Sequence, residues 1–329
     1  MLSLSNISVK QNLWERELFN SRLEVNIKGK NINHVVVNTI KRIGTSKVPI
    51  FSFTNLNIHQ NTSIFNNNYL KLRFKNLPVV GIKPDINIYK PIEEKKLDEI
   101  EEETGFINID DVNMNVEKDI NVSSLNKLTL YLEYENKTDK IVSVGTDDCK
   151  FYLKEKQIKS PYPVNIQLIK LQPSQKIKLS AITELGIENT SSIFSPVSIF
   201  TYRENNENDY DLILESRGQL NEYEILNITY SNIINDLENI VDLLPEDKNL
   251  EGKLVLKNIE HTLGNILSEG LQKHPNVDFA GYNMPHPLDN KILLHFKLNK
   301  GDLKSATIDV IKYYKNVFDL LNKELQKLQ

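Results

Sequence analysis

Residues 260–272, with the sequence EHTLGNILSEGLQ, decide the fold of this chain. Their apolar residues recur at the steps of one face of an α-helix, namely Leu263, Ile266, Leu267 and Leu271. The stretch therefore predicts an amphipathic helix from His261 to Gln272. Such a helix needs a second surface on which to bury its apolar face.

Strands are predicted on both sides of this helix. One strand is expected at Lys253–Ile259, and a strand pair is expected around Phe279 and at Ile292–Leu298. A long helix is then expected from Asp302 onward, with its apolar residues at three- and four-residue steps: Leu303, Ala306, Val310, Tyr314, Val317, Leu321, Leu325 and Leu328.

The start of the chain has the same order of elements. A strand at Leu23–Ile27 precedes a helix from Asn33 to Ile43, and a strand at Phe51–Ile58 follows it. The segments NTIKRI (38–43) and HTLGNI (261–266) occupy equivalent places on the two helices. One structural unit therefore occurs twice, which predicts an intramolecular pseudo-dimer.

The middle of the chain is expected to be rich in β-structure. Alternating apolar residues predict four strands, at 69–80, 128–134, 165–171 and 176–182. The acidic stretch Pro91–Glu103 is expected to be a solvated loop or a short surface helix. A strand at Asp211–Glu215 and a helix at Glu222–Leu244 follow, and the polar run Pro245–Gly252 is expected to be a connector.

Composition excludes several classes of protein. The 329 residues are 40% hydrophobic and 26% charged, so a folded globular chain is expected. A net charge of −4 argues against broad binding of nucleic acid. No apolar run approaches the roughly 18 residues that span a bilayer, and Met1–Gln11 has no signal-like core, so no membrane association is expected. Cys149 is the one cysteine, which fits a reducing compartment.

Candidate catalytic and metal-binding residues have little support. His261 has no second ligand at helical spacing, so capping or interface packing is favoured for it. His274 and His286 lack a third ligand, so no metal site is expected there. Asp147-Asp148-Cys149 offers carboxylates and a thiol, but no phosphate loop or nucleophile motif accompanies it. We therefore expect no catalytic residue, no metal and no cofactor.

The end of the chain resembles a known family. Glu260–Asn265, His274-Pro275, Phe279–Tyr282 and Pro285–Leu288 with Lys291 are similar to the small platform subunit of RNA polymerase, which is the archaeal L subunit and the eleventh eukaryotic subunit. This resemblance covers Gly252–Gln329.

The first part resembles the partner of that subunit, which is the archaeal D subunit, the third eukaryotic subunit and the bacterial alpha amino-terminal domain. The matching segments are Asn38–Arg42, Val48-Pro49, Asn61–Ser63, Leu77-Pro78, Gly186, Ser195–Val197 and Leu214–Leu220. Lys41 departs from the arginine that is usual there. The middle part lacks the cysteine sets that bind zinc or an iron–sulfur cluster in some relatives, and no DNA-binding module like that of bacterial alpha is expected.

The resemblance implies an α+β fold made of two alpha-like dimerisation units. The first unit would comprise 1–50 and 190–244, interrupted by a β-rich insert at 51–189. A linker at 245–252 would lead to the second unit at 253–329. The fusion of both subunits in one chain resembles the arrangement in polymerases of large DNA viruses.

The resemblance also implies a function without chemistry, as an assembly platform of a DNA-dependent RNA polymerase. Asn38 and Arg42 would dock a large subunit, and the two halves would meet through Val36, Ile40, Ile43, His261, Thr262, Leu263, Ile266, Leu267, Leu271, Phe279, Tyr282 and Leu321. For Arg42, the competing interpretation is a solvated helix arginine.

The implied partners are the second-largest and largest polymerase subunits and the small auxiliary subunits, with nucleic acid reached only through the complex. The implied location is a site of transcription in the nucleus or cytoplasm of an infected cell, or a virion. The alternative hypothesis is a free-standing β-rich interaction scaffold outside a polymerase, which would not co-purify with two very large subunits.

Overall fold

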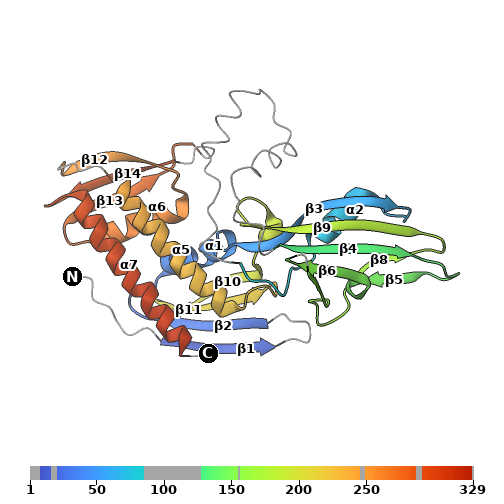
Figure 1. Ribbon diagram of the computed structural model, residues 1–329. Helices are drawn as coiled ribbons and strands as arrows, with labels where there is room; N and C mark the ends of the chain where they lie inside the picture. The colour runs from blue at the N-terminus through green and yellow to red at the C-terminus, as the bar shows by residue number, and fades with distance from the viewer. Residues whose placement is uncertain are drawn as a thin grey trace, which may run out of the picture. The chain divides into compact units, whose positions relative to one another are not determined.

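The computed structural model describes residues 8–15, 21–84, 127–154, 156–244, 249–286 and 291–327 (Figure 1). Contacts divide the chain into two compact units. Unit 1 comprises Met1–Val48 and Ser195–Gln329, and unit 2 comprises Pro49–Phe194. The acidic stretch at 91–103, the first half of the expected connector (245–248) and Leu328 of the predicted last helix lie outside the described residues.

The first half of unit 1 is a four-stranded antiparallel sheet with two helices. The strand order is β1 (Ser8–Glu15), β2 (Ser21–Lys28), β11 (Asp209–Ser216) and β10 (Val197–Asn206). Leu23, Val25 and Ile27 alternate along β2 and are buried, because side chains two apart share one face of a strand. The helices are α1 (His34–Ser46) and α5 (Glu222–Asp242).

The second half of unit 1 repeats this plan with three strands. The strand order is β12 (Glu251–Lys257), β14 (Lys291–Leu298) and β13 (Val277–Asn283). The helices are α6 (His261–Gln272) and α7 (Leu303–Gln326), and α6 contacts both β13 and β14. Each half thus has an antiparallel sheet and two helices, which confirms the predicted α+β class.

Polar side chains fix where most of these helices begin. Asn33, Asn221 and Asp302 each accept a hydrogen bond from the backbone N–H three residues later, at the start of α1, α5 and α7. These side chains satisfy donors that the first turn of a helix leaves without partners.

Unit 2 is the β-rich part of the chain. Its larger sheet has the order β3 (Ile50–Asn61), β9 (Lys176–Gly186), β4 (Leu128–Glu135), β6 (Cys149–Leu153) and β7 (Lys156–Ile158). The strands β5 (Val142–Gly145) and β8 (Gln167–Leu171) form a second sheet. One α-helix, α2 (Asn67–Lys75), and two single-turn 3₁₀ helices, η3 (Thr146–Asp148) and η4 (Ser192–Phe194), complete the described part of this unit.

The predicted strand at 69–80 is wrong, because α2 occupies the first part of it. Leu70, Leu72 and Phe74 alternate in sequence, as strand residues do. In the structure only Leu70 and Phe74 are buried, which is the four-residue step of a helix, and Leu72 faces solvent. The Asn66 side chain accepts a hydrogen bond from the Tyr69 N–H and starts the helix.

The other predicted helices and strands are confirmed, with their ends shifted by a few residues. Strand β12 begins at Glu251, inside the range expected for the connector, and α5 ends at Asp242 rather than Leu244. Sequence reasoning missed β1, β5, β6, β7 and β10. No helix in the described ranges is long and apolar enough to cross a membrane.

Candidate assembly interface

The helices of the two halves of unit 1 contact each other. Helix α1 contacts α6, and α5 contacts both α6 and α7 (Figure 1). The aliphatic interface residues predicted on α1 and α6 are all buried: Val36, Ile40, Ile43, Leu263, Ile266, Leu267 and Leu271. Burial of such side chains is worth roughly 1.5–3 kcal/mol each. The individual pairings between them stay a prediction.

Rings and amides hold α5 against α7. The rings of Tyr230 and Phe318 stack with their centroids 5.8 Å apart. Asn322 donates to Asn227 over 2.9 Å, and Lys315 donates to Glu238 over the same distance. Leu321, predicted for the interface, is fully buried on α7. The sequence indicated the apolar stripe of α7 but not Tyr230 or Phe318 as its contact with α5.

Glu269 on α6 is a polar node between the halves. Its carboxylate accepts a hydrogen bond from Asn33 Nδ2 over 2.6 Å, and it also accepts from the hydroxyl of Tyr314 on α7. Lys273 forms an ion pair with the same carboxylate. Burial and the neighbouring Glu269 charge raise the pKa of Tyr314 well above its usual range, so the phenol stays protonated and donates.

Asn33 serves two functions in this node. Its side-chain oxygen caps α1 by accepting from the Val36 N–H at 3.0 Å, while its Nδ2 group donates to Glu269. The start of α1 is thereby fixed against α6. Sequence reasoning missed this pair, because 236 positions separate the two residues and no apolar pattern marks them.

A surface beside the α1–α6 contact combines residues of both halves. We name Arg42, Tyr282 and His261 the seam surface. Arg42 is exposed on α1, and its charge acts on the phenol of Tyr282 on β13. His261, exposed at the start of α6, lies 3.4 Å from the Tyr282 hydroxyl. Burial raises the pKa of Tyr282, and the Arg42 charge partly opposes that shift.

The remaining residues predicted for the interface or for docking differ in how far they are buried. Thr262 is buried on α6, and Asn38 is half-buried on α1. Phe279 is 52% exposed, so the structure does not bury it in the interface. The register of β13 against β14 shifts between Val277 and Phe279. This irregularity places Val277 and Ala280 in the core and turns the Phe279 ring outward.

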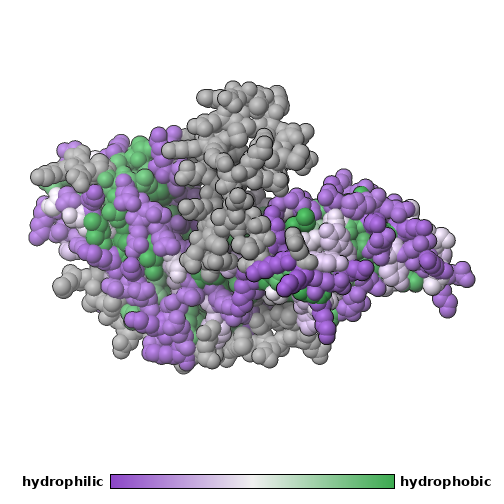
Figure 2. Space-filling view, viewed as in Figure 1, coloured by the Kyte–Doolittle hydropathy of each residue, from purple (hydrophilic) through white to green (hydrophobic). Residues whose placement is uncertain are grey.

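Val255 is also exposed, on β12 at the opposite edge of the same sheet. Figure 2 shows hydrophobic surface gathered over the region of β12, β14 and α6.

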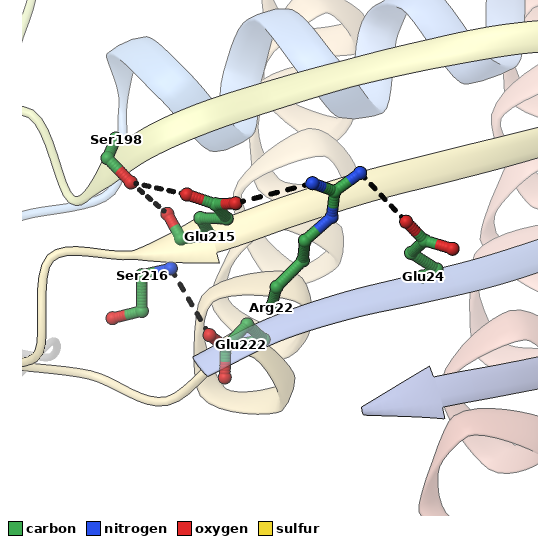
Figure 3. Close-up of polar contacts among 6 residues, drawn as sticks. All are labelled: Arg22, Glu24, Ser198, Glu215, Ser216 and Glu222. Atoms are coloured by element: carbon green, nitrogen blue, oxygen red, sulfur yellow. Dashed lines mark hydrogen bonds and ion pairs between the residues drawn. The ribbon is translucent and has the colours of Figure 1, made fainter. Parts of the chain in front are cut away.

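The segment Leu214–Leu220 forms a structural corner between β11 and α5 (Figure 3). Buried Glu215 lies 3.6 Å from Arg22 of β2 and accepts a hydrogen bond from Ser198 of β10. Arg22 also pairs with Glu24 at 2.8 Å. Glu222, at the start of α5, accepts from the Ser216 N–H at 3.2 Å. These contacts join three strands to a helix.

The same corner meets the segment at Ser195-Pro196. Arg217 donates through its backbone to Pro196 and through its guanidinium to Ser195, at 3.0 and 3.3 Å. Gly218 has a φ of 95°, a conformation that glycine adopts without strain. The segment before β10 and the segment after β11 are thus joined at one end of the four-stranded sheet.

The candidate chemical residues lie in separate parts of the described structure. Cys149 is buried at the start of β6, and burial with the neighbouring carboxylates of Asp148 and Asp147 raises the pKa of its thiol to about 12. His274 is buried and lies 3.7 Å from Asp309, while His286 is exposed. Among the described residues, no group of three or more His, Cys, Asp or Glu side chains is placed to hold a metal ion.

Comparisons with known proteins agree with this arrangement. Residues 251–329 match the RNA polymerase Rpb3/Rpb11 dimerisation domain. Over 335 residues the chain is 30% identical to the putative DNA directed RNA polymerase subunit R470 of Acanthamoeba polyphaga mimivirus, which covers 92% of this chain and 91% of that protein.

Two further matches cover shorter stretches of the chain. The chain is 39% identical over 75 residues to the DNA-directed RNA polymerases I and III subunit RPAC2 of Drosophila melanogaster, covering 22% of this chain and 68% of that protein. It is 58% identical over 38 residues to the probable DNA-directed RNA polymerase II subunit RPB11 of Caenorhabditis elegans, covering 12% and 31%.

The fold and the paired helices define a protein of the dimerisation-domain class, built for contacts between polypeptides. The chain belongs to the Rpb3/Rpb11-type subunits of DNA-directed RNA polymerase. It is a non-catalytic subunit of a nucleotidyltransferase complex, it acts in transcription, and its partners are other polymerase subunits.

Proposed function

We propose that this chain is the assembly platform of its polymerase, onto which the second-largest subunit docks first. The largest subunit and the small auxiliary subunits follow, and nucleic acid is reached only through the complex. The two halves of unit 1 are two alpha-like dimerisation units, at 1–50 with 190–244 and at 253–329. The region 51–189 is an insert in the first, and 245–252 is the linker.

The seam surface carries this proposal, because it contains residues of both halves. Arg42 comes from α1, whereas Tyr282 and His261 come from β13 and α6. A subunit that binds there contacts the two halves only when they are paired. A guanidinium with Asn38 on the same helix suits carboxylate and carbonyl groups of a protein partner.

The proposed place of action is the site of transcription in a reducing compartment, in the nucleus or cytoplasm of an infected cell, with packaging in a virion as a further location. The similarity to the mimivirus subunit over most of both chains supports the viral setting.

Reconstitution tests the platform proposal. Purified Arg42→Glu and wild-type chains are mixed with the second-largest subunit, and binding is measured by surface plasmon resonance. We expect Arg42→Glu to weaken binding at least about tenfold, since reversed charge at a docking contact costs more than its loss. Lys312→Glu reverses the charge of an exposed lysine on α7 and is the matched control, with unchanged binding expected.

Two results would contradict the proposal. One is wild-type affinity of the Arg42→Glu chain for the second-largest subunit. The other is assembly of the two largest subunits at a normal rate when this chain is omitted.

A further inference from the structure

Helix α2 and the turn before it expose an unusual amount of apolar surface in unit 2. Ile64 is 66% exposed, Tyr69 43% and Leu72 61%. Leu70 and Phe74 lie on the buried side of the helix. Leu72 lies on the opposite side and projects away from the core. Figure 2 shows hydrophobic spots among hydrophilic residues in the region where Figure 1 labels α2. We name Ile64, Tyr69 and Leu72 the α2 patch.

The turn that carries Ile64 is held in place by the Asn61 side chain. Asn61 donates to the Phe65 carbonyl at 2.8 Å and to Asn67 at 2.9 Å, and it accepts from the Ser63 N–H at 3.0 Å. The ring of Phe65 stacks on Tyr69 with centroids 4.6 Å apart. The patch is therefore fixed before any partner arrives, which lowers the entropic cost of binding.

The helix itself is anchored at its carboxyl-terminal turn. Ser52 of β3 donates to the Lys75 carbonyl over 3.1 Å, and Arg73 donates to the Gln167 carbonyl of β8 over 2.7 Å. These bonds tie α2 to strands of both sheets. The outward position of Leu72 is thus a property of the packed unit and not of a loose segment.

The chain segment that carries the patch has charges of one sign. Between Pro49 and Pro84 the chain has four basic residues and no Asp or Glu: Lys71, Arg73, Lys75 and Lys83. Lys71 and Lys75 lie one turn apart along α2, on the flank away from Tyr69. Strand β8, to which α2 is bonded, adds Lys170 and no acid. An acidic partner is favoured over a basic or neutral one.

We propose that the α2 patch docks an acidic segment with apolar side chains from another subunit of the polymerase. The apolar side chains cover Ile64, Tyr69 and Leu72, and the carboxylates face Lys71 and Lys75. The proposal rests on membership of the chain in a multisubunit polymerase and does not depend on the seam surface. The two surfaces lie in different units of the chain.

Other occupants fit these observations less well. A second copy of this chain would bring two basic patches together, which is repulsive. Single-stranded nucleic acid is bound by aromatic platforms, whereas aliphatic Ile64 and Leu72 dominate this patch. The guanidinium of Arg73 is already bonded to a backbone carbonyl. An acidic protein segment satisfies both the apolar and the charged parts.

Crosslinking in the assembled enzyme identifies the occupant. A photo-reactive amino acid replaces Leu72 in the full chain, the polymerase is assembled and irradiated, and crosslinked peptides are identified by mass spectrometry. We expect one dominant crosslink to a net-acidic peptide of another subunit. Crosslinks to the acidic residues 85–126 of this same chain, to a second copy, to nucleic acid or to nothing would overturn the proposal.

A charge variant with a matched control measures the contribution of the patch. We expect Leu72→Glu to raise the dissociation rate of the crosslinked subunit about tenfold or more, since it places an acid against an acidic partner. Ile141→Glu changes a residue of the same unit that is 64% exposed and lies outside α2, and should leave that rate unchanged. Equal rates for Leu72→Glu and Ile141→Glu would overturn the proposal.

The two surfaces are tested separately. Arg42→Glu tests whether the second-largest subunit binds at the seam surface. If that variant binds normally, the platform proposal fails, but the crosslink from position 72 still tests the α2 patch independently. Circular dichroism of Leu72→Glu shows whether the fold of unit 2 is kept, and Lys71→Glu combined with Lys75→Glu repeats the test without touching an apolar residue.

Discussion

At the scale of single residues, the bond between Asn33 and Glu269 connects the capping of a helix to the pairing of the two halves. Both hydrogen-bonding groups of the Asn33 amide are used, one within α1 and one across to α6. The Tyr314 hydroxyl depends on the same carboxylate. Removal of the carboxylate leaves the buried Tyr314 hydroxyl and the half-buried Asn33 amide without their acceptor, which is more costly than the loss of the bond itself.

We predict that Glu269→Leu lowers the free energy of unfolding by about 1–3 kcal/mol. Asn33→Ser keeps a capping oxygen and removes only the donor to Glu269. Because both changes break the same bond, the double variant should be less destabilised than the sum of the single variants. Urea denaturation of the four proteins measures this coupling.

The substitution Asn221→Ser, combined with Glu269→Leu, is the control for this comparison of single and double variants. Asn221 caps α5 and exchanges hydrogen bonds with Glu224, not with Glu269. Asn221→Ser and Glu269→Leu should therefore be additive. Additivity of Asn33→Ser with Glu269→Leu would show that the bond contributes nothing to stability.

At the scale of elements, helices α6 and α7 approach so closely at Gly270 that no side chain fits there. A Cβ atom at Gly270 would lie 2.4 Å from Val310 Cγ1 and 2.7 Å from Tyr314 Cε2. Both neighbours are fully buried and have no room to move away. The close crossing of the two helices therefore depends on this glycine.

We predict that Gly270→Ala destabilises unit 1 by about 1–3 kcal/mol, although alanine favours helices. Val310→Ala removes the atom that lies nearest to the added methyl group. The two changes together should be less destabilising than their sum, as measured by the midpoint of urea unfolding. A stabilised Gly270→Ala protein would show that the crossing has more space than the structure indicates.

At the scale of the whole molecule, the two halves of unit 1 belong to one polypeptide, so their pairing is intramolecular. A short tether gives an effective concentration in the mM range or higher. Separate subunits that pair in the same way are stabilised by mass action, and their unfolding temperature depends on concentration.

We predict that the unfolding temperature of this chain is independent of protein concentration over a hundredfold range. Calorimetry at several concentrations, with light scattering to confirm a monomer, provides the measurement. A rise of the unfolding temperature with concentration would indicate that the helices pair between chains.

Part of this structure could be predicted from the sequence alone. The apolar steps of Ile40 and Leu263 indicated amphipathic helices, because the 3.6-residue period leaves its mark on local sequence. The repeated order of elements and the segment 260–272 predicted the α+β class and the family. Buried aliphatic residues of the interface were found for the same reason, since burial on a helix follows its period.

Only the tertiary structure decided the rest, because the missing information depends on contacts distant in sequence. Leu72 alternates like a strand residue and yet faces solvent on α2, and a register shift turns Phe279 out of the core. Asn33 meets Glu269 from 236 positions away. Local periodicity determines which face of an element is apolar, whereas packing in three dimensions decides what that face meets.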